Sequence, residues 1–235
     1  MSDLALEDAS FAFGDRAIID GVDLGLERGS LVGLVGPNGV GKTTVLELLG
    51  GLRTLDGGTV SRPETPGRTV AYLPQDPDFC RGFTVRQTVA FYADLVAGDV
   101  DPAAALERVG LDGVADRRVE ALSGGMVRLL GLAQAFVGDP PVVLLDEPTG
   151  GLDPDVADRI FEAAAEVAAE DRVVVLASHD LGGVEAAADR VVLLTRDGVA
   201  FDDAPAAVLK ATSTDSLRAA FRATVGDGLS REGAR

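Results

Sequence analysis

The chain has 235 residues, of which 46% are apolar, so it can bury one large core or two modest ones and is not expected to be disordered. Its 38 acidic and 21 basic residues give a net charge of −17, which opposes binding to nucleic acids or anionic membranes, since the sequence contains no basic patch. A single cysteine, Cys80, excludes an intramolecular disulfide and a cysteine metal cluster.

The basic residues are nearly all arginines, because Lys42 and Lys210 are the only lysines. Acidic, lysine-poor sequences are typical of salt-accumulating cells, where salt screens a dense carboxylate surface. High-GC codon bias is the alternative, although it explains the acidity less well. The start of the chain lacks a basic region followed by an apolar run, so no signal peptide is expected. No apolar run reaches the ~18 residues that suggest a membrane span, so a role at a membrane would require a partner.

Short apolar runs in the first third of the chain predict strands over residues 4–13, 18–26 and 30–36. A helix is expected over 42–49, and a further short strand over 70–75. The strand runs then stop from residue 84 to 136, where apolar residues recur at helical spacing.

Within that helical stretch, Asp101 is a candidate N-cap and Pro102 stands at the first helical position. Strands are expected again at 141–146, 172–178 and 190–194, with a helix over 155–169. Alternating strands and helices predict a mainly parallel sheet with its ligands at the carboxyl ends of the strands. The tail after residue 225 is expected to be loose.

The segment "GPNGVGKTT", residues 36–44, matches the phosphate-loop pattern G-x-x-x-x-G-K-[ST] between a predicted strand and a predicted helix. Its glycines let backbone N–H groups converge on an anion at a helix N-terminus. In this pattern Lys42 reaches the β- and γ-phosphates and the Thr43 hydroxyl binds Mg²⁺. A glycine-rich turn could match by accident, but the strand and helix around it favour nucleotide binding.

The segment "VVLLDEP", residues 142–148, places two carboxylates at the end of a buried strand. Adjacent positions in a strand point to opposite sides, so the two carboxylates can serve different purposes. Asp146 would hold Mg²⁺ through water, while Glu147 would polarise the water that attacks the γ-phosphate. The alternative is an ordinary strand end with acidic residues. The phosphate loop earlier in the chain favours the catalytic interpretation over this alternative.

The segment "LSGGM", residues 122–126, stands just before the predicted helix 127–136. Ser123 is a candidate cap, and the free N–H groups of a helix start can bind an anion, although a plain helix start is the simpler alternative. The only histidine, His179, follows the strand run 172–178. A lone histidine at such a place is more often a core residue than a functional one.

Taken in order, these motifs resemble an ATP-binding-cassette (ABC) nucleotide-binding domain over nearly the whole chain. On that resemblance, Phe13 before Gly14 is the aromatic that stacks on adenine, and it is preferred to Phe11, which alternates with it. Gln75 lies in the Q-loop, Asp153 in the D-loop "GLD", and His179 in the switch region. There the imidazole would act as a clamp and sensor of the γ-phosphate.

The resemblance implies an α/β fold of the P-loop NTPase type, with a mainly parallel sheet, an N-terminal antiparallel β subdomain and an inserted α-helical subdomain. The expected organisation is a single domain over residues 1–225 and a flexible tail over 226–235. The core lobe would comprise residues 1–80 and 137–225, and the helical lobe residues 81–136.

The resemblance also implies ATP and Mg²⁺ as ligands. The expected catalytic residues are Lys42, Gln75, Glu147 and His179. Those expected to bind the nucleotide are Phe13, Gly36, Pro37, Asn38, Gly39, Val40, Gly41, Lys42, Thr43, Thr44, Ser123, Gly124, Gly125 and Asp153. Those expected to hold Mg²⁺ are Thr43, Gln75 and Asp146.

The implied function is the ATP-hydrolysing subunit of an ABC transporter at the cytoplasmic face of the membrane, attached through a separate integral-membrane permease. Two such domains, as a homodimer or with a close paralogue, would pair head to tail, so that Ser123 and Gly125 of one close over the ATP of the other. The signature segment departs from the commonest family pattern, with Met126 where glutamine is usual and Leu129 where arginine is frequent. The segment "LSGGM" followed by "LGLAQAF" resembles the exporter group whose permeases are of the ABC-2 kind.

Two alternatives stay open. A soluble ABC ATPase of repair, chromosome maintenance or translation usually carries a coiled coil, a zinc site or a second cassette. The sequence shows none of these, and its charge argues against nucleic acid. A phosphate-loop kinase would leave the signature segment and His179 unexplained.

Overall fold

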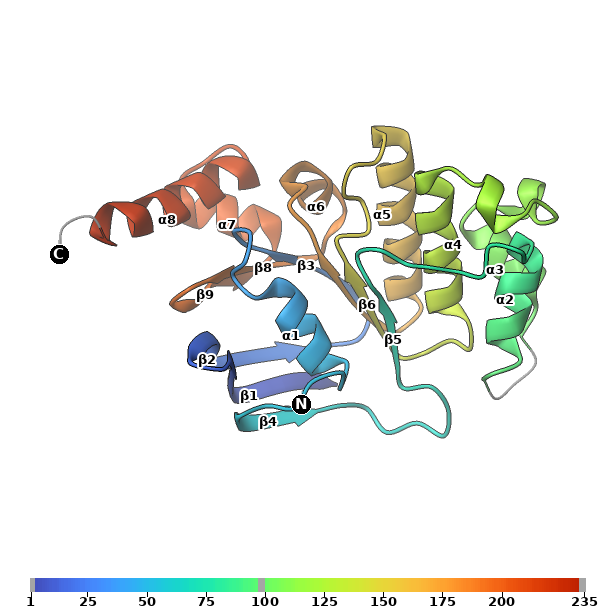
Figure 1. Cartoon of the computed structure of the whole chain (residues 1–235). Helices are drawn as coiled ribbons and strands as arrows, with labels where there is room; N and C mark the ends of the chain where they lie inside the picture. The colour runs from blue at the N-terminus through green and yellow to red at the C-terminus, as the bar shows by residue number, and fades with distance from the viewer. Residues whose placement is uncertain (1–2, 97–99, 233–235) are drawn as a thin grey trace.

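Two sheets and a set of inserted helices make up the part of the chain that the computed structural model describes, residues 3–96 and 100–232, without the side chains of 227–232 (Figure 1). The smaller sheet is antiparallel, with strand order β2-β1-β4. Its strands are β1 (Leu4–Phe13), β2 (Arg16–Leu26) and β4 (Gly57–Ser61).

The larger sheet has the strand order β5-β6-β7-β3-β8-β9, and all its pairings are parallel except the last. Its strands are β3 (Ser30–Val35), β5 (Val70–Leu73), β6 (Val142–Asp146), β7 (Val173–Ala177), β8 (Arg190–Thr195) and β9 (Gly198–Asp203). The expected P-loop NTPase fold, with a mainly parallel sheet and an antiparallel N-terminal sheet, is confirmed.

Both faces of the large sheet are covered, which explains why its central strands are continuous apolar runs rather than alternating ones. On one face, α1 (Lys42–Leu49) packs between the two sheets (Figure 1). The other face carries α4 (Gly124–Phe136), α5 (Pro154–Ala169) and α6 (Leu181–Ala187). Because β3, β5, β6 and β7 run parallel, the loops that follow them emerge at the same edge of the sheet.

The helical insertion between β5 and β6 contains α2 (Val85–Ala93), α3 (Pro102–Arg108), two short 3₁₀ turns (Asp112–Val114 and Val119–Ala121) and α4. Asp101 caps α3 as expected, accepting a hydrogen bond from the Ala103 N–H at 2.8 Å, and Pro102 occupies the first turn. Thr84 and Gln87 form a capping box at the start of α2. Local capping therefore fixes where these helices begin.

The helix expected over 127–136 begins three residues earlier, at Gly124. The Ser123 hydroxyl accepts the Met126 N–H at 3.3 Å, which makes Ser123 the N-cap, as expected, and places both signature glycines in the first turn. The prediction of the start at residue 127 was wrong because the helix begins directly after its cap, Ser123, and so includes Gly124, Gly125 and Met126.

The chain ends with β9, α7 (Pro205–Thr212) and α8 (Leu217–Glu232), none of which was predicted. The flexible tail expected over 226–235 stays a prediction, since α8 continues to Glu232 and residues 233–235 lie outside the described part of the chain. Within the described residues, no helix is both long and apolar enough to cross a membrane.

The acidic residues lie almost entirely at the surface. Among the described side chains, Asp146 is the only buried carboxylate. At low ionic strength a net charge of −17 destabilises the compact state by self-repulsion, and molar salt shortens the screening length to about 3 Å.

If the acidic surface is a salt adaptation, the midpoint of thermal unfolding should be at least about 5 °C higher in 2 M KCl than in 0.05 M KCl. For a chain of this size that shift corresponds to about 1–2 kcal/mol. A neutral osmolyte at matched osmolality controls for solute exclusion. An equal or higher midpoint in dilute buffer would contradict the adaptation and favour codon bias.

Candidate active site

The loop between β3 and α1, residues 36–41, is shaped to receive an anion. Gly41 has a left-handed backbone (φ 113°), and no side chain caps the first turn of α1, so the N–H groups there are available to a ligand. A Cβ on Gly36 would lie 2.5 Å from the Leu194 carbonyl oxygen, so only glycine fits at the start of the loop. Both features agree with the phosphate-loop interpretation.

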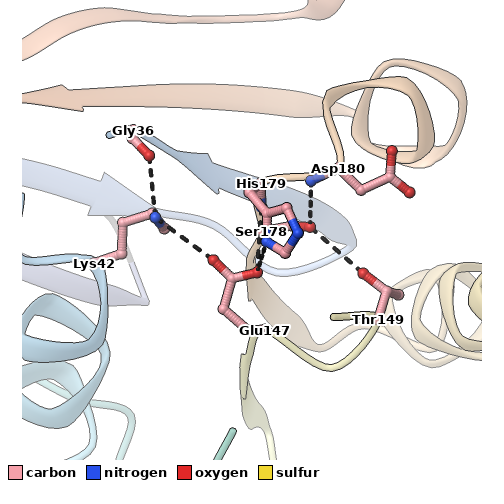
Figure 2. A network of polar contacts seen from close by, with 7 residues as sticks. All are labelled: Gly36, Lys42, Glu147, Thr149, Ser178, His179 and Asp180. Atoms are coloured by element: carbon pink, nitrogen blue, oxygen red, sulfur yellow. Dashed lines mark hydrogen bonds and ion pairs between the residues drawn. The ribbon is translucent and has the colours of Figure 1, made fainter. Parts of the chain in front are cut away.

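Lys42 is 7% exposed, and its Nζ donates to the Gly36 carbonyl oxygen at 3.0 Å. The same Nζ lies 3.5 Å from Oε1 of Glu147, which follows β6 (Figure 2). A buried ammonium with a carbonyl and a carboxylate as neighbours is held across the mouth of the loop, where it can reach a phosphate.

Glu147 adopts a left-handed backbone (φ 46°), which is costly for a residue with a side chain. Its N–H donates to the Ala177 carbonyl oxygen at 2.9 Å, so the end of β6 stays paired with the end of β7. This backbone turns the carboxylate toward Lys42 on one side and toward His179 on the other.

His179 donates from Nδ1 to Oε2 of Glu147 at 2.7 Å, and its backbone N–H lies 3.2 Å from the same oxygen (Figure 2). The backbone on either side of His179 is held by a hydrogen bond, in which the Oγ of the buried Ser178 accepts the Asp180 N–H at 3.0 Å. The imidazole itself is 62% exposed, so it is not the core histidine that its position after a buried strand suggested.

Asp146, at the end of β6, is 2% exposed. Its Oδ2 accepts a hydrogen bond from the Tyr72 hydroxyl at 3.2 Å, while its Oδ1 is buried without a protein partner. Burial raises the pKa of this carboxyl, and the neighbouring hydroxyls of Thr43 and Tyr72 lower the pKa in part. Burial and the nearby carboxylate likewise raise the pKa of Tyr72.

A buried carboxylate oxygen with no partner, close to Thr43, fits Mg²⁺ as a ligand. The described residues contain no group of three or more His, Cys, Asp or Glu side chains that could hold a metal alone. The ion would therefore depend on phosphate oxygens and water for its remaining ligands, as Mg²⁺ usually does.

Only some of the predicted site residues lie close to one another in the structure. It brings together Lys42, Glu147 and His179 by direct contacts, and Asp146 near Thr43. Gln75 is exposed two residues after β5. Ser123 and Gly124 are exposed at the start of α4, and a Cβ on Gly125 would lie 3.3 Å from Val156 of α5 rather than near the phosphate loop.

Comparisons with known proteins agree with this geometry. Residues 19–150 match the family model described as "ABC transporter". The chain belongs to the ABC transporter family. It is 42% identical to the zinc import ATP-binding protein ZnuC of Paracoccus denitrificans over 184 residues, which cover 77% of this chain and 71% of that protein. It is 34% identical to the Nod factor export ATP-binding protein I of Burkholderia lata over 211 residues, covering 84% and 69%.

A solved structure titled "Structure of ATP binding subunit of ABC transporter" has the same fold, with a TM-score of 0.82 at 23% identity, covering 95% of this chain and 100% of that one. This ABC protein is thus an ATP-binding subunit whose ATPase activity is coupled to transport. Its similarity to both an import protein and an export protein leaves the direction of transport open.

Tyr72 is the residue of this ABC site that sequence reasoning missed. Its ring is half-buried, and its hydroxyl donates a hydrogen bond to the carboxylate expected to hold Mg²⁺. Tyr72 pairs with Leu144 in the parallel β5–β6 register, two residues before Asp146. Only knowledge of that strand pairing would have pointed to it.

Proposed function

We propose that this chain is the ATPase subunit of an exporter, that it pairs head to tail with a second copy or a close paralogue, and that it binds a separate ABC-2-type permease at the cytoplasmic face of the membrane. The observation that carries the catalytic part is the chain of contacts from Lys42 through Glu147 to His179. Nucleic acid is not an expected partner of so acidic a chain.

The β- and γ-phosphates of ATP would draw Lys42 from its contact with Glu147, because phosphate oxygens carry more charge than a single carboxylate oxygen. Glu147 would then be free to accept a hydrogen bond from the attacking water and to polarise it. His179, next to Glu147, would contact the γ-phosphate or that water and respond when the phosphate leaves.

Asp146, Thr43 and Gln75 would hold Mg²⁺, which would supply positive charge beside the phosphate oxygens. Phe13 would stack on adenine from the end of β1. Ser123 and Gly125, which lie on the helical insertion and not beside the phosphate loop of the same chain, would serve the phosphate loop of the partner copy. The exposure of Ser123 and the partial exposure of Gly125 support this assignment.

Export is supported by the signature "LSGGM" followed by "LGLAQAF", and by 34% identity to an export ATP-binding protein over 84% of the chain. Import is the second candidate, favoured by the 42% identity to a zinc import protein over a shorter stretch.

Identification of the membrane protein that co-purifies with the tagged chain, followed by transport in vesicles, distinguishes these candidates. With that permease in inside-out vesicles, added ATP should drive the cargo into the vesicle lumen. ATP-dependent accumulation only in right-side-out vesicles loaded with ATP would show import. If no membrane protein co-purifies, the transporter assignment itself is contradicted. The Glu147→Gln variant, which is expected to bind ATP without hydrolysing it, provides the control for ATP-driven movement.

A further inference from the structure

An aromatic and arginine cluster surrounds the side chain expected to stack on adenine. Phe13, at the end of β1, is 49% exposed and meets Phe11 edge to face, with ring centroids 5.0 Å apart and an interplanar angle of 89°. The guanidinium of Arg53 lies over both rings, 4.8 Å from the centroid of Phe13 and 5.7 Å from that of Phe11. One part of the Phe13 ring is thus covered by a cation while the rest is open.

Arg53 is held in this position from two directions. Its Nε pairs with Oε2 of Glu47, a residue of α1 that lies one turn after Thr43, and the two side chains are 35% and 20% exposed. The loop that carries Arg53 is also tied to β1, since Asp56 accepts the Ala12 N–H at 2.8 Å and donates its own N–H to the Ser10 carbonyl oxygen at 2.9 Å. The guanidinium is therefore fixed relative to the Phe13 ring.

We propose that Arg53 is a positioning residue of the adenine subsite: with Glu47 as its anchor, it backs one face of Phe13 and leaves the opposite face to the base. A guanidinium is attracted to the negative face of an aromatic ring. By drawing electron density toward itself, it would strengthen stacking of an electron-rich purine on the other face. Because the base lies far from the reacting phosphate, this effect appears in nucleotide affinity and not in the chemical step. The inference rests on the proposed role of Phe13.

Titration calorimetry with ADP and with inorganic pyrophosphate, both in the presence of Mg²⁺, tests this inference, because only ADP carries a base and neither ligand is hydrolysed. Arg53→Ala should weaken ADP binding by about two- to fivefold and leave pyrophosphate binding unchanged. Arg53→Lys, which keeps the charge and loses the flat guanidinium, should have an ADP affinity between those of Arg53→Ala and the unmodified chain. Arg86→Ala, which removes an ion-paired surface arginine of α2, is the matched control and should leave the affinity for both ligands unchanged.

Phe13→Ala separates failure of the inference from failure of the proposed subsite. If Phe13→Ala weakens only ADP while Arg53→Ala has no effect, or weakens both ligands equally, the assignment of Arg53 is wrong and the adenine subsite stands. If Phe13→Ala leaves the ratio of ADP to pyrophosphate affinity unchanged, the adenine subsite itself is wrong.

Discussion

Glu147→Gln is expected to lower the rate of ATP hydrolysis by at least about 100-fold while ATP still binds with nearly unchanged affinity. The amide has the size of the carboxylate but cannot accept a proton or polarise water as strongly. The backbone contact that pairs Glu147 with Ala177 does not involve the side chain, so the end of β6 should keep its position. Phosphate release at saturating Mg²⁺ and ATP, together with nucleotide titration, measures both effects.

Glu166→Gln provides the matched control, since it makes the same chemical change on the exposed side of α5. It should hydrolyse ATP like the unmodified chain. Normal turnover by Glu147→Gln would show that another group polarises the attacking water, and the assignment of Glu147 would be wrong.

His179→Ala is expected to reduce turnover by about 100-fold with little change in ATP affinity. A carboxylate can only accept hydrogen bonds, so the Nδ1 atom of His179 carries the proton that binds Glu147. The neutral ring then presents Nε2 as an acceptor to solvent. Donation to a γ-phosphate would require rotation of the ring or a second proton, so the proposed role implies that His179 changes its hydrogen-bond partner during the cycle.

Steady-state kinetics distinguish the roles open to His179. Loss of kcat with KM nearly constant supports a contact made in the transition state, whereas a raised KM with unchanged kcat would show a role in binding alone. His179→Gln, which retains a hydrogen-bond donor, should recover part of the lost rate. If it does not recover any activity while nucleotide still binds, donation from this position is not what hydrolysis needs.

The features predicted well from the sequence are those set by local patterns. Buried parallel strands such as 142–146 and 173–177 are continuous apolar runs, and the phosphate loop is a contiguous motif. The strands β4 and β9 were missed because "GGTVS" and "GVAFDD" are polar edge strands whose pairing comes from neighbours distant in the chain. These two strands form because of tertiary contacts and not because apolar residues recur at regular spacing in their sequences.

Contacts within the site could be predicted only for residues that belong to a recognised sequence motif. Lys42, Asp146, Glu147 and His179 could be placed at one sheet edge, because parallel strands end together. The Tyr72 contact to Asp146 spans 74 positions, and the position of Arg53 over Phe13 depends on the loop tied to β1 by Asp56. Neither contact follows from spacing along the chain, since both require the register of strands and loops.

Sedimentation velocity of the Glu147→Gln chain tests most directly the central claim, a two-copy site closed by ATP and opened by hydrolysis. With Mg²⁺ and ATP this variant should sediment as a dimer, and with ADP as a monomer. Adding Ser123→Arg should abolish the dimer without preventing ATP binding, because Ser123 would contact only the nucleotide of the partner. An ATP-bound monomer at every protein concentration, or a dimer indifferent to nucleotide and to Ser123→Arg, would contradict the account.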